Sequence, residues 1–442
     1  MPAAPDVETV ASRAYAKVTW RILPVLLAAY ALGVIDRGNV SYGQLAMQDE
    51  LGFTDAIYGL GAGIFFIGYF LFEIPANLLV VRLGARTALA WMMGLWSVAS
   101  AATALIATPL HFYIVRFSLG LFEAGLFPGL ILCISFWFPA ARRGRIIALL
   151  FVATLVTNAV IGPISGGILE AMEGVAGLHN WQWLFLLEAA PSLVCGVVAY
   201  LVLVDGPAKA EWLSGPEKDT ILKDLKEEEA AKITGSASRR QTFSDPGVYI
   251  FSFGLFAVLA GFYAVTFWTP MIIRSAGVTN MLHIGLYAII PNVISALAML
   301  WTARKSDAAA DPRWYFVVPL FLAAIGLAVT SLQGSLPVSI LALSIASAGV
   351  MCALPTIWAM VTAYLPAATA AVGIAFINSV GVLSGFVTPY LVGSIRTSTG
   401  SSIAAFSPIW LAMLAGAVVI AVLAPKRHLT AAPPNGNAVG AG

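Results

Sequence analysis

Long apolar runs, separated by short polar segments, dominate the pattern of this chain. A helix needs about 20 mostly apolar residues to span a bilayer, and six runs of that order precede a polar central segment while six more follow it. The runs cover residues 18–44, 56–80, 87–107, 111–138, 145–169, 182–204, 247–274, 282–303, 314–332, 336–364, 371–395 and 402–424. The pattern therefore predicts an all-α membrane protein with twelve transmembrane helices, arranged as six plus six.

The polar segments set the expected organisation of the chain. In the central segment, Ser214-Gly-Pro-Glu217 resembles a capping box, and apolar residues follow it at helical spacing, so we expect one amphipathic helix there. The final residues are rich in Pro, Gly, Asn and Ala, a composition typical of disorder. The expected units are an N-terminal segment (1–17), a first six-helix bundle (18–204), a central loop with the amphipathic helix (205–246), a second six-helix bundle (247–424) and a disordered tail (425–442).

The two halves of the sequence also contain similar patterns at corresponding positions. Trp137-Phe-Pro139 closes the fourth run, and Tyr364-Leu-Pro366 closes the tenth. Gly162-Pro163 in the fifth run has a counterpart in Thr388-Pro389 of the eleventh. A parallel repeat of this kind indicates two bundles related by a pseudo-two-fold axis along the membrane normal, with the substrate site between them.

Positive charge is distributed unevenly between the two sides of this array. If the runs are spans, 20 of the 24 Lys and Arg residues share the side of the N-terminus, and only Arg274 and Arg396 fall on the other. Cytoplasmic loops carry such an excess. We therefore expect a multi-pass protein of the cell inner membrane with both termini and the central loop in the cytoplasm. With 60% hydrophobic and 10% charged residues, a soluble domain is excluded.

The sequence lacks the usual patterns of an enzyme. No Walker loop, HExxH or GxSxG pattern occurs, and the three cysteines lie far apart in apolar runs without metal-ligand spacing. We therefore expect neither a catalytic function nor a bound metal or organic cofactor. The expected partners are a small molecule and the lipid bilayer, with no nucleic acid, and we expect the chain to work as a monomer.

Four charged residues fall at membrane depth in the first and fourth runs: Asp36, Arg37, Arg116 and Glu123. Ionisable groups at this depth are costly and tend to be functional or paired. One interpretation is a neutral cluster that only holds the bundle together. The other is a transport site, in which an arginine offers a bidentate fork to a substrate carboxylate and a buried carboxylate exchanges protons. We favour the transport site, because two matched charge pairs exceed what packing requires.

Further polar residues lie within or at the ends of runs. Glu73 stands near the cytoplasmic end of the second run, ahead of Arg82 and Arg86, and we expect these three to form a latch between the bundles. An amide in a span otherwise made of small residues needs a partner, so Asn378 is a candidate ligand contact. Glu188 is expected to have a structural, hydrogen-bonded role.

Several runs are similar to the anion:cation symporter family of the major facilitator superfamily. The similarity covers most of the chain and is strongest from Ile35 to Gly206. The runs are Asp36-Arg37-Gly-Asn39, Gly61-Ala-Gly-Ile-Phe-Phe-Ile-Gly-Tyr69-Phe-Leu-Phe-Glu73-Ile-Pro75-Ala-Asn77, Arg116 to Glu123-Ala-Gly-Leu-Phe-Pro128-Gly129, Trp137-Phe-Pro139 and Trp183-Leu-Phe-Leu-Leu-Glu188.

This resemblance implies the major facilitator fold and a division of roles among the polar residues. It implies proton coupling by Asp36 and Glu123, contact of Arg37 and Arg116 with the substrate carboxylate, and a site lined in addition by Tyr69 and Asn378. Members of the family carry organic anions such as tartrate, sugar acids, phthalate and 4-hydroxyphenylacetate.

Two departures from the family pattern stand out. Asn77 and Val81 replace a glycine and an aspartate that the superfamily usually places between the second and third spans, so Glu73 is expected to substitute for the missing carboxylate. Val382 stands where many relatives have a second asparagine, which removes one polar contact. The substrate is therefore expected to differ from that of near relatives.

The sequence favours proton-coupled import of a small organic anion over three alternatives. A proton-antiport exporter of drugs or metabolites seldom needs two arginines in its cavity. A sugar-phosphate exchanger would use paired arginines but would not need both carboxylates. A receptor would be expected to add a soluble output domain. Residues of the second bundle are expected to contact the uncharged end of the anion. They are Tyr263, Phe267, Trp268, Trp358, Tyr364, Asn292 and Asn378.

Overall fold

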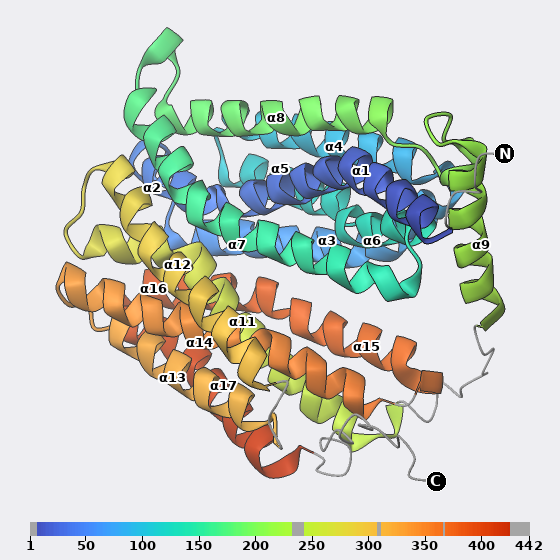
Figure 1. Cartoon of the computed structure of the whole chain (residues 1–442). Coiled ribbons are helices and arrows are strands. Elements are labelled where there is room, and N and C mark those ends of the chain that lie inside the picture. The colour runs from blue at the N-terminus through green and yellow to red at the C-terminus, as the bar shows by residue number, and fades with distance from the viewer. Residues whose placement is uncertain (1–6, 232–242, 307–310, 366, 425–442) are drawn as a thin grey trace, which may run out of the picture.

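The computed structural model describes residues 7–231, 243–306, 311–365 and 367–424. These residues form helices and connecting turns, with no strand among them. Two groups of helices make up the molecule: α1 to α8 fill the upper part of Figure 1, and α11 to α17 fill the lower part. The expected disordered tail (425–442) lies outside the described residues.

The first group supplies six membrane crossings. Short 3₁₀ turns, Thr103–Leu105 and Val175–Gly177, follow α4 and α7. Its helices are α1 (Val7–Gly38), α2 (Val40–Leu51), α3 (Asp55–Leu83), α4 (Ala85–Ala102), α5 (Pro109–Glu123), α6 (Leu126–Trp137), α7 (Ala140–Ala171) and α8 (Asn180–Val202).

The second group supplies six more crossings. A 3₁₀ turn, Pro207–Lys209, and the surface helix α9 (Gly215–Ala231) connect the two groups. The helices of the second group are α11 (Pro246–Ser275), α12 (Met281–Ser306), α13 (Trp314–Thr330), α14 (Leu336–Tyr364), α15 (Ala367–Val382), α16 (Ser384–Thr399) and α17 (Ser402–Leu423).

The described residues contain eleven apolar stretches long enough to cross a membrane, and α13 is a twelfth, shorter apolar helix. The predicted number and order of spans are therefore confirmed. Three runs expected as single helices are each divided: α1 and α2 meet at Asn39, α5 and α6 at Ala124 and Gly125, and α15 and α16 at Leu383. Two of the divisions adjoin the polar clusters at Asp36 and Glu123.

Helix α9 packs against the end of the molecule where α1 begins, at the right margin of Figure 1. Tyr15 Oη donates a hydrogen bond to Asp224 over 2.7 Å, and Lys17 Nζ lies 2.7 Å from Glu217 Oε1. The Lys17 ammonium and the Ser214 backbone N–H hold the pKa of the Glu217 carboxyl below its usual range. These contacts fix the surface helix to the first group, and we call this end of the molecule the α9 face.

At the opposite face the two groups are in direct contact through glycines. A Cβ atom on Gly59 of α3 would lie 2.1 Å from the Pro389 carbonyl oxygen of α16. A Cβ atom on Gly285 of α12 would lie 2.0 Å from the Gly162 carbonyl oxygen of α7. Both crossings therefore depend on the missing side chain, which lets the backbones approach closely. The structure is closed at this face.

Candidate functional site

The centre of the site is an ion pair between the first and fourth spans. Arg37 Nε lies 2.6 Å from Glu123 Oε1. The Glu123 side chain is 1% exposed and that of Arg37 is 30% exposed, so the glutamate is buried while the arginine side chain is partly accessible. Glycine at position 33 makes room for this pair, since a Cβ there would lie 3.1 Å from Glu123 Oε1.

Arg116, the second expected substrate arginine, is fully buried beside this pair. Its Nε donates to the Gly61 carbonyl oxygen at 3.4 Å, and its buried Nη2 has no hydrogen-bond partner among the described residues. The Phe65 ring lies within 5.1 Å of the Arg116 guanidinium and 5.8 Å of the Arg37 guanidinium, measured to the ring centroid. Phe65 thus contacts both cations, and only Arg37 is accessible in this conformation.

Asp36 is the neighbour of Arg37 in sequence but faces other helices. Its carboxylate accepts hydrogen bonds from Trp96 Nε1 at 2.8 Å and Ser100 Oγ at 2.8 Å, both on α4, and from Ser192 Oγ of α8 at 3.0 Å. The side chain is buried. Asp36 therefore ties the first span to the third and sixth, whereas Arg37 turns toward the fourth.

Aromatic residues of both groups surround the accessible arginine. The Tyr69 ring centroid lies 5.1 Å from the Arg37 guanidinium. Across the interface, Tyr263 of α11 packs edge to face on Phe66, with centroids 4.6 Å apart, and lies within electrostatic range of Arg37. Asn378 on α15 is half-buried and forms no hydrogen bond among the described residues. The structure thus brings Tyr69 to Arg37.

The expected latch of Glu73, Arg82 and Arg86 is not formed in this structure. Among the described residues Glu73 makes no ion pair with either arginine. The Arg86 backbone N–H instead donates to Asp205 Oδ1 at 3.0 Å, and its guanidinium lies 4.4 Å from the Tyr200 ring centroid. Asp205 therefore places a carboxylate at the backbone of Arg86, whereas the Arg86 guanidinium donates to the Tyr200 carbonyl oxygen. Asp205 lies just beyond α8, too far along the chain for local spacing to reveal it.

Three residues that were expected to contact the substrate instead contact other residues of the protein. Trp268 is buried against Tyr58 and Phe406. Tyr364 Oη donates to Asp245 Oδ1 over 2.6 Å near the α9 face. Asn292 Nδ2 donates to the Asn158 carbonyl oxygen at 2.8 Å, which joins α12 to α7.

Glu188 has the structural contact that was expected, because Ser165 Oγ donates to its Oε1 at 2.7 Å. No group of three or more metal-binding side chains occurs in the part of the chain that the structure describes. The sequence reasoning missed Phe65, Trp96 and the serines that hold Asp36. Trp96 could have been noticed as an indole inside a span, since such a group needs an acceptor.

Comparisons with known proteins agree with this architecture. Residues 26–389 match the family model described as Major Facilitator Superfamily. A putative tartrate transporter of Agrobacterium vitis is 39% identical over 434 residues, which is 98% of this chain and 98% of that protein. A quinolone resistance transporter of Acinetobacter baumannii is 34% identical over 413 residues, covering 92% of this chain and 94% of that one.

Among solved structures, a D-xylose-proton symporter superposes with a TM-score of 0.75 at 16% sequence identity, covering 92% of this chain and 98% of that chain. At this identity the likeness concerns the fold, which is two bundles of membrane-spanning helices. The expected fold class is confirmed, as is the expectation of a protein that is not an enzyme. The chain belongs to the Major Facilitator Superfamily and is a multi-pass membrane transporter.

Proposed function

We propose that the protein imports a small organic anion together with protons by alternating access. The observation that carries this proposal is the ion pair of a buried Glu123 and a partly accessible Arg37 side chain. An accessible guanidinium in a membrane-spanning bundle is suited to a carboxylate, which it can hold through two parallel hydrogen bonds.

The same pair couples the anion to a proton. While Glu123 is ionised it occupies Arg37, and a substrate carboxylate must compete with it. Protonation of Glu123 removes its charge and releases the guanidinium. Proton binding then raises anion affinity, and by linkage anion binding raises proton affinity by the same factor. This reciprocity is what a symporter requires, because the loaded carrier holds both ions or neither.

Asp36 and Arg116 have supporting parts in this proposal. Three hydrogen-bond donors satisfy the Asp36 carboxylate without a cation, so its protonation would loosen the contacts between α1, α4 and α8. We therefore assign the substrate-linked proton to Glu123 and the conformation-linked proton to Asp36. Arg116, with an unpaired buried nitrogen, would meet the substrate once Phe65 moves aside.

The substrate class follows from the groups around Arg37. One end of the ligand would be a carboxylate held by Arg37 and then Arg116, and the other would carry hydroxyls or an aromatic ring against Tyr69, Tyr263 and Asn378. A hydroxy acid such as tartrate, a sugar acid or an aromatic carboxylate fits. We place the α9 face in the cytoplasm of an inner membrane, which makes the closed face the outer one.

Uptake into proteoliposomes tests this function. With tartrate, galactonate, phthalate and 4-hydroxyphenylacetate as labelled probes, an inward proton gradient should drive accumulation of at least one of them. A protonophore should stop net accumulation, while empty liposomes serve as the control. Accumulation that persists unchanged without the gradient, or transport confined to cations, would contradict the proposal.

A second candidate is drug export by proton antiport, favoured by the 34% identity to a quinolone resistance transporter. An exporter would move a quinolone out of vesicles when protons flow in the opposite direction. The same proteoliposomes distinguish the two functions, because import and export respond to the gradient with opposite signs. We place export second because the putative tartrate transporter is more similar to this chain, at 39% identity.

A further inference from the structure

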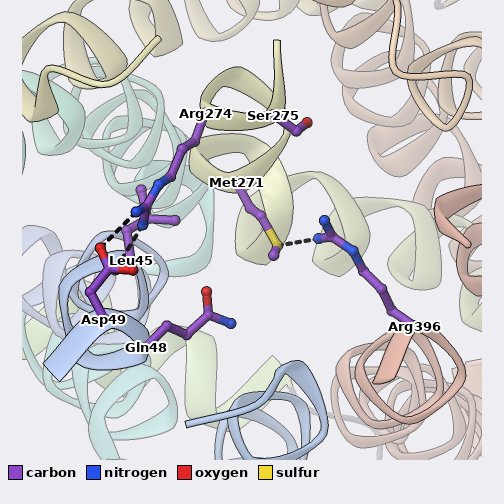
Figure 2. A pocket seen from close by; sticks show the side chains of 7 residues that line it. All are labelled: Leu45, Gln48, Asp49, Met271, Arg274, Ser275 and Arg396. Atoms are coloured by element: carbon purple, nitrogen blue, oxygen red, sulfur yellow. Dashed lines mark hydrogen bonds and ion pairs between the residues drawn. The ribbon is translucent and has the colours of Figure 1, made fainter. Parts of the chain in front are cut away.

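A cavity of about 300 Å³ lies between the two groups of helices at the closed face. It is separate from the Arg37 site and is lined by the ends of three helices. Figure 2 shows Arg274 and Arg396 on opposite sides of it, with Met271 between them. Its lining residues are Leu45, Gln48, Asp49, Met271, Arg274, Ser275 and Arg396. We call it the gate cavity.

The two arginines of the gate cavity are the two that the charge count placed on the side opposite the N-terminus. Arg274 bridges the two groups of helices, with Nη2 2.6 Å from Asp49 Oδ2 and Nη1 2.8 Å from the Leu45 carbonyl oxygen. Arg396 Nε lies 3.4 Å from Asp55 Oδ2. Both pairs join α11 or α16 to the first group, so they help to hold this face closed.

These contacts use only part of the hydrogen-bonding capacity of the Arg396 guanidinium. Its Nη1 is directed at the sulfur of Met271, as the dashed line in Figure 2 marks, and a thioether is only a weak acceptor. Its partner Asp55 also accepts hydrogen bonds from Gln48 at 2.6 Å and Gln44 at 3.3 Å. Guanidinium donors are therefore available at the wall of the cavity.

The guanidinium groups are what an anion would meet in this cavity. Two guanidinium groups and one carboxylate line it, and a second carboxylate, Asp55, lies beside Arg396 behind the lining, so an anion would compete with a carboxylate at each arginine. The volume lies at the lower end of the range for small-molecule pockets, about 300 to 1,000 Å³. A compact acid with two carboxylates could reach the arginines on both walls. It would also compete with Asp49 for Arg274, an exposed pair in which the aspartate side chain is 62% exposed.

We propose that the gate cavity is a second, outer binding site for a small dicarboxylate, which occupies Arg274 and Arg396 before it reaches the Arg37 site. Occupation displaces Asp49 from Arg274 and so weakens one of the contacts that hold the outer face closed. The inference rests on the proposed function for its orientation and its class of ligand. Binding of the substrate at the gate cavity would then favour opening of the outer face.

A cysteine reporter at Ser275 tests the site directly. Ser275 is exposed in the cavity, and the three native cysteines, Cys133, Cys195 and Cys352, are buried. In purified Ser275→Cys protein in detergent, labelling by a hydrophilic maleimide should slow when tartrate or phthalate is added. At a concentration about twice the dissociation constant, mass action gives about threefold slowing. Sodium chloride at equal ionic strength is the control.

Three substitutions distinguish an anion site from ion pairs that only hold the face closed. If Arg274 only pairs with Asp49, then Arg274→Gln and Asp49→Asn should change labelling in the same direction. If Arg274 binds the anion, Arg274→Gln should raise the anion concentration needed for half-maximal protection by about tenfold or more, the loss expected for one charge-assisted hydrogen bond. Asp49→Asn should strengthen protection, because the competitor is gone. Arg396→Gln should weaken protection as Arg274→Gln does.

The same reporter distinguishes this inference from the proposed function. Protection should persist in an Arg37→Gln background, where the Arg37 site is impaired. Protection lost in that background would mean that the reporter senses the Arg37 site, and the gate cavity would not be a site of its own. No protection by either dianion, or equal protection by chloride, would also overturn the inference even if proton-driven uptake is intact. Thermal unfolding checks that each variant is folded.

Discussion

At the scale of single residues, the chemistry depends on which side chain each charge meets. Asp36 and Arg37 are adjacent in sequence, yet Asp36 accepts three neutral hydrogen bonds while Arg37 pairs with Glu123. Adjacent helical residues point about 100° apart, because a turn contains 3.6 residues. Of the four charged residues expected at membrane depth, Asp36 thus joins α1 to α4 and α8, Arg37 and Glu123 form an ion pair, and Arg116 is buried beside that pair.

The Arg37–Glu123 pair predicts that Glu123→Gln separates accumulation from exchange. Glutamine cannot carry the coupled proton, so gradient-driven accumulation should be abolished. Exchange of labelled for unlabelled anion should survive. Glu188→Gln is the matched control, since it changes a buried carboxylate that contacts Ser165 instead. Exchange and accumulation lost together in Glu123→Gln would indicate a structural role.

Arg37→Lys tests the guanidinium rather than the charge. Lysine keeps the charge but loses the planar fork that holds a carboxylate through two hydrogen bonds. The KM for uptake should rise by about tenfold, with a smaller change in the maximal rate. Arg304→Lys, at an exposed position near the end of α12, should leave KM unchanged. An unchanged KM in Arg37→Lys would remove Arg37 from the substrate contact.

At the scale of helices, two glycine crossings set how closely the groups approach. Gly59 meets the backbone of α16, and Gly285 meets the backbone of α7, each at a distance that no side chain could occupy. The Arg396–Asp55 pair lies beside the first of these crossings, because Gly393 of α16 packs on the backbone of Asp55 and Gly59. A helix crossing of this kind acts as a switch, because packed interfaces have discrete arrangements and do not deform continuously.

Gly285→Leu should therefore shift the population away from the closed outer face. Spin labels at Glu50→Cys and Thr279→Cys, both exposed near this face, would report a longer distance by pulsed electron resonance. Gly94→Leu is the control, because nothing lies within 4 Å of a Cβ atom there. An unchanged distance distribution in Gly285→Leu would mean that the crossing does not limit closure.

At the scale of the whole molecule, orientation in the membrane governs the direction of transport. The α9 face holds the start of α1 and the surface helix, and the uneven distribution of Lys and Arg is the ground on which we propose that this face is cytoplasmic. Both gradient-driven import and the outer position of the gate cavity depend on that assignment.

Reporter fusions check the orientation. An alkaline phosphatase that is active only in the periplasm should be silent when fused near Lys226 in α9. The same reporter fused after Gly277, between α11 and α12 at the opposite face, should be active and serves as the positive control. Activity at Lys226 would reverse the proposed direction.

The sequence by itself determined the number of spans, their order, the central surface helix and the residues at membrane depth. These follow from local quantities, since the thickness of the bilayer fixes the length of an apolar run and the charge of each loop is read directly. Tyr69, which the family resemblance implied as a residue lining the site, lies with its ring centroid 5.1 Å from the Arg37 guanidinium.

Only the tertiary structure decided which of these residues meet. Several contacts join residues that are distant in sequence. They are the contacts of Phe65 with both arginines of the site, of Asp205 with Arg86, and of Arg274 and Arg396 with aspartates across the closed face. The rotation of a membrane helix about its axis is set by packing against its neighbours rather than by its own hydropathy. A run of apolar residues therefore fixes that a helix crosses the membrane, whereas the contacts among helices fix which side chains form the site.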